Sequence, residues 1–185
     1  MINPLAQRLL DVGLIQFGWF QHGKTTLPFS LNLDMLASYP AILEQAASEA
    51  QTLLSSLNVT RLLATTDAVP FGVAVSLRTG IPLVYSRGAG EAPVFDLIGA
   101  YDIGHPSMLL TNSSGWNAPP TELIKGARRV GLEVHTLVTL LETRPEPADY
   151  TVLPLLRFTD VVRDLEAAGQ LSSLHTQAVL QFTHS

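Results

Sequence analysis

Short apolar runs alternate with amphipathic segments along the middle of this chain, and few folds accommodate that order. Runs with the length and composition of β-strands lie at residues 59–65, 81–86, 93–98, 108–111 and 132–141. Segments 70–79 and 119–130 have helical spacing and end at Gly80 and Gly131, as helices commonly do. Strands that alternate with helices pair in parallel through right-handed crossovers. The sequence therefore predicts an α/β fold with an open, mostly parallel, twisted sheet flanked by helices.

The two ends of the chain carry fewer regular elements. We expect helices at residues 3–12, 40–57 and 159–169, the last being the final helix, and a short strand at 151–155. Pro40 suits the first position of its helix, and Ser38 is a possible cap. Residues 14–36 are predicted to be irregular, because glycines and a proline interrupt them.

Composition limits the function classes. At 185 residues the chain has the size of one domain, and its net charge of −5 argues against a nucleic-acid partner bound by a basic face. The chain has no cysteine, which excludes metal sites with thiolate ligands. Its five histidines lack the spacing of metal ligands, so we also predict no metal site built on histidine. No apolar run reaches about 18 residues and no signal-peptide pattern is present, so we expect a cytoplasmic protein with no membrane partner. Charged residues are only 15% of the chain, which favours burial of some surface in an oligomer.

Three loops follow strands at the edge where parallel sheets bind ligands. Ligands of open α/β sheets lie at the carboxyl ends of strands, where the strand order reverses. This rule selects residues 65–70, 87–92 and 112–120. The last loop precedes a helix, a common place for phosphate to bind. However, only Asp96 and Asp102 carry charge between residues 92 and 121, so no Lys or Arg of this stretch can meet a phosphate.

One segment matches the P-loop pattern of nucleotide-binding proteins letter for letter. It is Gly-Trp-Phe-Gln-His-Gly-Lys-Thr, from Gly18 to Thr25. A P-loop requires a helix that starts at Lys24 and Thr25, and Pro28 falls where that helix should continue. The competing interpretation is a hairpin-like turn with an exposed lysine.

Several segments occur together in an order and at a spacing typical of one enzyme family. Residues 14–20 hold an apolar pair followed by Phe-Gly-Trp-Phe, which ends at Phe20. Residues 65–72 read Thr-Thr-Asp-Ala-Val-Pro-Phe-Gly, and the strand after the next helix ends at Arg87. Residues 104–120 align without a gap with a phosphoribosyl pyrophosphate motif. In this series the chain resembles the type I phosphoribosyltransferases, and within them the orotate phosphoribosyltransferase branch.

The resemblance implies a fold and a set of site positions. The fold would have a core at about residues 40–142 and a small hood formed by about residues 1–36 and the C-terminal segment. Phe20 and Lys24 would belong to the hood. The pyrophosphate-binding loop would hold Thr65, Thr66 and Asp67, together with Arg87. The phosphoribosyl pyrophosphate motif would fall on Asn112, Ser113, Ser114, Gly115, Trp116, Asn117 and Ala118.

The letters that carry the family's chemistry differ in this chain. The family's two acids, which hold ribose hydroxyls, fall on Asn112 and Ser113, which supply no opposing charge. Its Thr-Thr-Gly-Gly-Ser phosphate loop falls on residues 116–120, where a tryptophan adds bulk and two prolines, Pro119 and Pro120, remove N–H donors. The lysines that follow the arginine in the family are replaced by glycine, alanine and Glu91.

Three functions remain open from the sequence. The first is an orotate phosphoribosyltransferase-like protein without efficient transferase activity that acts as a binding or regulatory homologue. The second is an active transferase that makes a nucleotide from a base and phosphoribosyl pyrophosphate, for which Mg²⁺ would be the cofactor. The third is a P-loop nucleotide-binding protein. The resemblance also implies a homodimer, while the small-molecule ligand is left unnamed.

Overall fold

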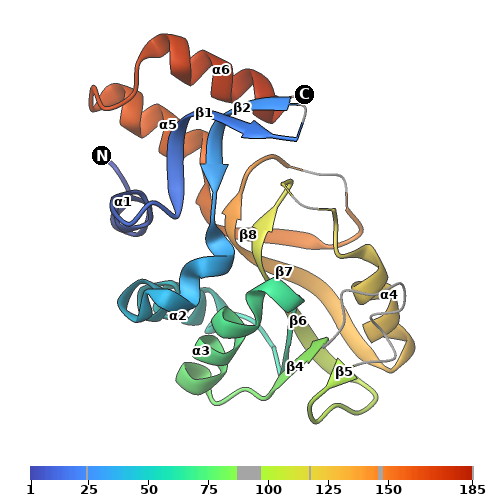
Figure 1. The fold of residues 1–185 in the computed structure, drawn as a ribbon. Helices are drawn as coiled ribbons and strands as arrows, with labels where there is room; N and C mark the ends of the chain where they lie inside the picture. Colours follow the sequence, from blue (N-terminus) through green and yellow to red (C-terminus); the bar gives the residue numbers. More distant parts are fainter. Residues whose placement is uncertain (24, 87–96, 117, 146–147, 185) are drawn as a thin grey trace.

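The core of the protein is a six-stranded sheet with the strand order β5-β4-β3-β6-β7-β8 (Figure 1). The structure, a computed structural model, describes residues 1–23, 25–86, 97–116, 118–145 and 148–184. The strands are β3 (Arg61–Ala64), β4 (Leu83–Ser86), β5 (Leu97–Ile98), β6 (His105–Ser114), β7 (Leu132–Glu142) and β8 (Thr151–Arg157). All neighbours pair in parallel except β5, which is antiparallel to β4. The predicted α/β class and mostly parallel sheet are confirmed.

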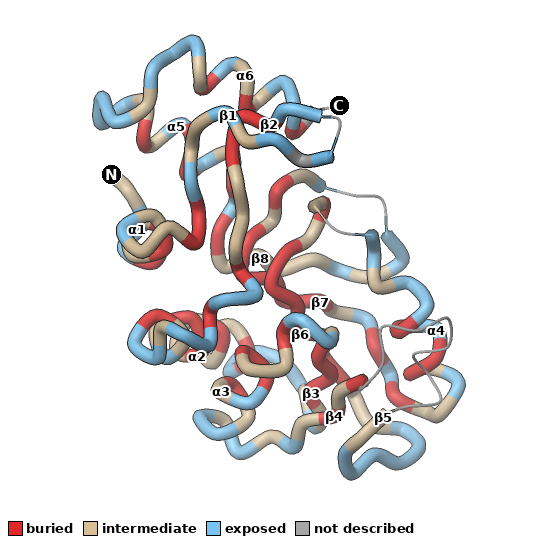
Figure 2. The backbone as a smooth tube through the Cα atoms, in the orientation of Figure 1, coloured by how far each residue is buried: buried red, intermediate tan, exposed pale blue. Residues whose placement is uncertain are grey.

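Helices cover both faces of this sheet because its strands are apolar on both sides. The helices are α2 (Pro40–Leu54), α3 (Val69–Thr79) and α4 (Thr121–Arg129). On β3, Leu62 belongs to the apolar cluster that includes α2 and α3, and its neighbour Leu63 belongs to the cluster of α4. Successive strand residues point to opposite faces, so this alternation places α4 opposite α2 and α3. Figure 2 shows the resulting run of buried backbone along the central strands.

The two chain ends meet beside the sheet. An antiparallel hairpin is formed by β1 (Ile15–His22) and β2 (Thr25–Leu31), and two helices, α5 (Phe158–Ala167) and α6 (Ser173–His184), lie near it (Figure 1). Aromatic rings join these parts: Phe17 of β1 stacks on Phe158 of α5 at 5.7 Å between centroids, and Phe29 of β2 lies 5.5 Å from Phe182 of α6. The hairpin and the C-terminal helices therefore share one set of packed side chains.

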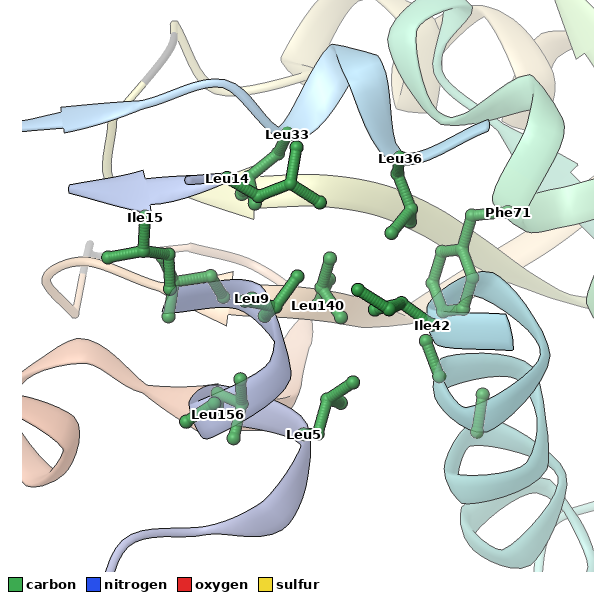
Figure 3. Packing of buried hydrophobic residues seen from close by; sticks show 14 of the residues in the cluster. Leu5, Leu9, Leu14, Ile15, Leu33, Leu36, Ile42, Phe71, Leu140 and Leu156 are labelled. Carbon is green, nitrogen blue, oxygen red and sulfur yellow. The ribbon is translucent and has the colours of Figure 1, made fainter. Parts of the chain in front are cut away.

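Two short elements flank this hairpin along the chain, one before it and one after it. The helix α1 (Pro4–Asp11) begins after Asn3, whose side chain accepts a hydrogen bond from Leu5 N at 2.8 Å. A 3-10 turn, η1 (Leu33–Ser38), follows β2 and buries Leu33 and Leu36. Figure 3 shows these two leucines in the same packed layer as Phe71 of α3. The turn is therefore held by apolar packing at the junction of hairpin and sheet.

The structure corrects four local expectations. The segment predicted to be irregular is mostly the β1–β2 hairpin, because the pairing of His22 with Thr25 closes a turn. Residues that a P-loop would place in a helix are in strand β2, so the P-loop prediction is wrong and the segment is a hairpin; Lys24 itself lies outside the described residues. Ser38 does not cap α2, since Tyr39 is the N-cap and no side chain caps it. The helix α5 is not the last, because α6 follows it.

Other boundaries differ little from those predicted. The strand expected at 108–111 extends over His105–Ser114, since β7 pairs with it along that length. Of the strand expected at 93–98, only β5 lies within the described residues. The helix expected at 119–130 begins at Thr121, directly after the two prolines. Among the helices described, none is long and apolar enough to span a membrane.

Candidate functional site

A pocket opens where the strand order of the sheet reverses. The chain passes from β3 outward to β4 and β5, and from β6 outward to β7 and β8, so the reversal lies between β3 and β6. Ligands of open α/β sheets bind at this point, beyond the carboxyl ends of the strands. The pocket has a volume of about 240 Å³, and its lining residues are Leu31, Leu33, Asp34, Asp67, Asn112, Ser113 and Trp116. It brings together residues of two of the three predicted loops, and the third, at residues 87–92, lies outside the described residues.

Asn112 holds the walls of this pocket together. Its side chain is 3% exposed near the end of β6. The Nδ2 group donates to the backbone oxygen of Asp67 at 2.8 Å and to that of Leu33 at 3.3 Å. The Oδ1 atom is buried and, within the described chain, has no hydrogen-bond partner. At the position where the resemblance places an acid, the amide therefore connects the end of β6 to η1 and to the short turn η2 (Thr66–Ala68).

The residues after Asn112 continue the strand instead of forming an open loop. Ser113 pairs with Leu141 and Ser114 with Glu142 on β7. The backbone oxygen of Ser114 accepts hydrogen bonds from the backbone N and the Oγ1 of Thr143, at 2.9 and 2.8 Å. This part of the predicted phosphate motif is thus fastened to the loop after β7.

Gly115 allows the chain to turn away from that loop. Its φ is +75°, a left-handed conformation that favours glycine. A Cβ placed there would lie 2.8 Å from the backbone nitrogen of Arg144 and would also meet the Arg144 backbone oxygen. Glycine is therefore required here by the close approach of two backbone segments, and no ligand is needed to explain it.

Trp116 points toward the hairpin and the C-terminal helix. Its ring lies 5.1 Å from the ring of Phe29 in β2 and 6.1 Å from that of Phe182 in α6. Trp116 is also among the residues that line the pocket. The residue that the sequence placed in a phosphate loop thus packs against both chain ends.

The predicted pyrophosphate loop forms the opposite wall. Thr65 follows β3, and its backbone N donates to Leu110 O at 3.1 Å. Thr66 and Asp67 belong to η2 (Thr66–Ala68), the short turn before α3, and both are exposed. Of these three, Asp67 lines the pocket. That this loop binds pyrophosphate stays a prediction.

The other predicted residues do not join the described pocket. Ala118 is exposed and lies just before Pro119 and Pro120, while Phe20 is half-buried on β1; neither lines the pocket. Lys24, Arg87 and Asn117 lie outside the described residues, as does residue 91 of the loop after β4. The geometry above therefore concerns the remaining candidates.

Three lining residues were missed from the sequence. They are Leu31, Leu33 and Asp34, which belong to the end of β2 and the start of η1. The segment was predicted to be irregular, so no strand end pointed to it. One signal was available in the sequence. Leu33 and Leu36 are three positions apart, a spacing that puts both on the buried side of a short turn and leaves Asp34 on its other side.

The charge of the pocket wall is negative in the described part of the chain. Asp34 and Asp67 are both exposed carboxylates, and no lysine or arginine is among the described lining residues. Mg²⁺ needs an octahedral set of oxygen ligands, commonly carboxylates together with substrate phosphates. Within the described residues, no group of three His, Asp or Glu side chains is arranged to hold a metal ion. The described side chains therefore do not form a protein-held Mg²⁺ site.

The fold is shared with known phosphoribosyltransferases. The chain superimposes on the UMP synthase of Leishmania donovani with a TM-score of 0.80 and 25% identity, over 97% of this chain and 41% of that protein. It superimposes on the orotate phosphoribosyltransferase of Francisella tularensis with a TM-score of 0.73 and 16% identity, over 95% of both chains. For a third structure, the orotate phosphoribosyltransferase of Aeropyrum pernix, the TM-score is 0.68 and the identity 16%, over 88% of this chain and 99% of that one.

These similarities agree with the order of motifs in the sequence. No protein-family model and no curated protein matches the sequence. The chain spans about two fifths of the length of the UMP synthase that it matches. The chain thus has the type I phosphoribosyltransferase fold that these orotate phosphoribosyltransferase structures share.

Proposed function

We propose that this protein is an orotate phosphoribosyltransferase homologue without efficient transferase activity, which keeps the scaffold as a binding or regulatory protein. The observation that carries the proposal is the role of Asn112. Its amide is buried and donates to two backbone oxygens, so it supplies neither a negative charge nor a free N–H group to a substrate. A positive charge that develops on a sugar would meet no carboxylate at this position.

Two further features support the proposal. Trp116 packs on Phe29 and Phe182 where the resemblance implies a small phosphate-binding loop. Pro119 and Pro120 lack the N–H donors that bind phosphate at a helix start. Charge-stabilising groups in active sites are each typically worth about 3–4 kcal/mol, or 10²–10³ in rate. Loss of several should leave little turnover, even if their effects are not additive.

The test is a direct assay of binding and turnover. Titration calorimetry with phosphoribosyl pyrophosphate and Mg²⁺ should give no measurable heat of binding, and no conversion of orotate should be detected. An orotate phosphoribosyltransferase assayed in parallel serves as the positive control. A kcat above about 1 s⁻¹, which is an ordinary enzyme rate, would overturn the proposal and restore the active-transferase alternative with Mg²⁺ as its cofactor.

We also infer that the protein is a homodimer. The low content of charged residues, 15%, leaves apolar surface to cover. Two apolar residues on α3, Val73 and Leu77, lie about one helical turn apart and are 43% and 81% exposed. Light scattering at micromolar concentration should give twice the chain mass of 20.0 kDa. A mass equal to that of one chain would contradict this inference.

A further inference from the structure

We propose that Trp116 occupies, as part of the chain itself, a binding space for a planar aromatic molecule, and that its indole ring keeps this space closed. The space lies beside the pocket at Asn112, and Trp116 borders both. This role of Trp116 goes beyond the proposed function, because it concerns what closes the site and does not depend on whether a phosphoribosyl group is transferred. Three observations carry it: the tight packing around the ring, the support of the walls, and the aromatic lining.

The first observation is the tight packing around the ring. Next to the pocket of about 240 Å³, a second gap of only about 10 Å³ borders Trp116. A gap of this size holds about one water molecule. The other residues around it, which we call the aromatic chamber, are Phe29, Gly115, Thr143, Arg144, Phe182 and Thr183. The indole therefore nearly fills the space that these residues border, and it separates that space from the pocket.

The second observation is that the chamber walls are held by contacts without Trp116. Phe29 is buried, and its ring lies 5.5 Å from that of Phe182, so β2 and α6 pack on each other directly. Another part of the wall is held by Thr143, which donates through its backbone N and its Oγ1 to the backbone oxygen of Ser114. Removal of the indole should therefore leave a cavity whose walls stay in place.

The third observation is the aromatic lining. The indole lies 5.1 Å from the ring of Phe29 at an angle of 53°, and 6.1 Å from that of Phe182 at 52°. Aromatic rings attract one another in edge-to-face and offset arrangements, at about 4.5–7 Å between centroids. Apolar cavities of about 150 Å³ stay dry and bind small aromatic molecules such as benzene. A free planar ring should therefore make the same contacts once the indole is absent.

The position of Trp116 makes this contact autoinhibitory. While the indole lies in the aromatic chamber, a ligand in the pocket at Asn112 cannot extend toward Phe182. When the indole leaves, the pocket and the chamber form one continuous site, and a ligand that uses both competes with Trp116 for the same space. The joined site suits a ligand with a flat aromatic ring next to a polar group, because the pocket side is lined by Asn112 and Asp67.

The experiment is a titration of the full chain with free indole, followed by calorimetry. We expect Trp116→Ala to bind indole at least about tenfold more tightly than the unmodified protein does, and indole to raise the unfolding temperature of this variant alone. The matched control is Ile103→Ala, which removes an exposed apolar side chain just before β6 and should bind indole no better than the unmodified protein. The double change Trp116→Ala with Phe182→Ala should lose the binding, because it also removes one wall.

Two further variants keep the test decisive if Trp116→Ala is too unstable to fold. Trp116→Leu keeps part of the packing and should bind the smaller ring benzene, which the unmodified protein should not bind. The chain has two tryptophans, so Trp19→Phe leaves Trp116 as the single one. Its fluorescence should be quenched by acrylamide less than that of Trp19 in Trp116→Phe, because Trp19 is 65% exposed.

Each negative outcome has a distinct meaning. If the folded Trp116 variants bind indole or benzene no better than Ile103→Ala does, the chamber is no binding space and the assignment is wrong. Equal binding of indole by the unmodified protein, or equal quenching of the two tryptophans, would show that Trp116 does not close the chamber. Turnover of phosphoribosyl pyrophosphate would overturn the proposed function and leave the role of Trp116 to be decided by these titrations.

Discussion

The side-chain Nδ2 of Asn112 donates a hydrogen bond of 2.8 Å to the backbone oxygen of Asp67. The two residues come from β6 and η2, and a second hydrogen bond from the same nitrogen reaches Leu33 in the turn after the hairpin. One amide thus joins three parts of the chain around the pocket. A carboxylate cannot replace it, because it has no N–H to donate at neutral pH.

Asn112→Asp should therefore destabilise the protein instead of restoring a catalytic acid. The change removes two hydrogen bonds and places a buried negative charge beside two backbone oxygens, with an expected loss of about 2–4 kcal/mol. Urea unfolding measures the loss, with Thr66→Ala at an exposed site as the control.

The double change Asn112→Glu with Ser113→Asp should likewise fail to create binding of phosphoribosyl pyrophosphate. Normal stability together with such binding would show that the acids alone were missing.

Trp116→Ala should weaken the attachment of α6. The tryptophan packs on Phe29 and Phe182, and truncation of a large, partly buried aromatic residue is expected to cost about 2–4 kcal/mol. Faster hydrogen exchange in α6 and a lower urea midpoint would both follow. Ile103→Ala is the control, because Ile103 is 83% exposed just before β6 and should cost less than about 1 kcal/mol. Equal effects of the two changes would contradict a packing role for Trp116.

Gly115→Ala should be more harmful than the same change at Gly23. Both glycines have positive φ, +75° and +61°, so each alanine carries a backbone cost of about 1–2 kcal/mol. At Gly23 a Cβ meets nothing within 4 Å, whereas at Gly115 it meets the backbone of Arg144. We expect a loss of about 3–5 kcal/mol at Gly115. Chemical denaturation of both variants tests the difference, and equal losses would count against the close approach.

The ion pair of Arg128 with Asp149 should give a small acid dependence. The Arg128 side chain donates to Asp149 at 2.5 Å, and this hydrogen bond lowers the pKa of the carboxyl from its ordinary value of 3.8. A carboxyl whose pKa is lower in the folded state stabilises that state above the unfolded value, and the contribution is lost as pH falls through the folded value. An NMR titration should show Asp149 below 3.8, and Arg128→Gln should raise it. Arg129→Gln, at the exposed neighbouring position, should not.

The order of strands and helices was predictable because it depends on local periodicity. The spacing of apolar residues predicts both α3 and strand β7, and Gly80, which has a positive φ, marks the end of α3. The predicted bounds of both elements lie within a residue or two of the observed ones. The same reasoning failed at α6, whose apolar pattern is weak, and at the β1–β2 hairpin, where glycine and proline mask a strand. In the hairpin, cross-strand pairing and aromatic packing outweigh local preference.

The site was predictable only in part, for a related reason. Asp67 and Asn112 were found because one lies just after β3 and the other near the end of β6, and these buried strands end at the same edge of the sheet. Asp34 was not found, because it reaches the pocket through a short turn whose position depends on the packing of Leu33 and Leu36.

Local sequence is enough to predict the alternation of strands and helices, and hence the parallel sheet and the edge where its loops meet. It also shows that the positions of the acidic pair are neutral and that two prolines stand in the predicted phosphate loop. What the substituted residues do became visible in the folded chain alone. Asn112 holds backbone oxygens, and Trp116 packs on both chain ends, because segments distant in sequence come within hydrogen-bond and van der Waals range there. Local sequence carries no information about such distances, which depend on the packing of the whole chain.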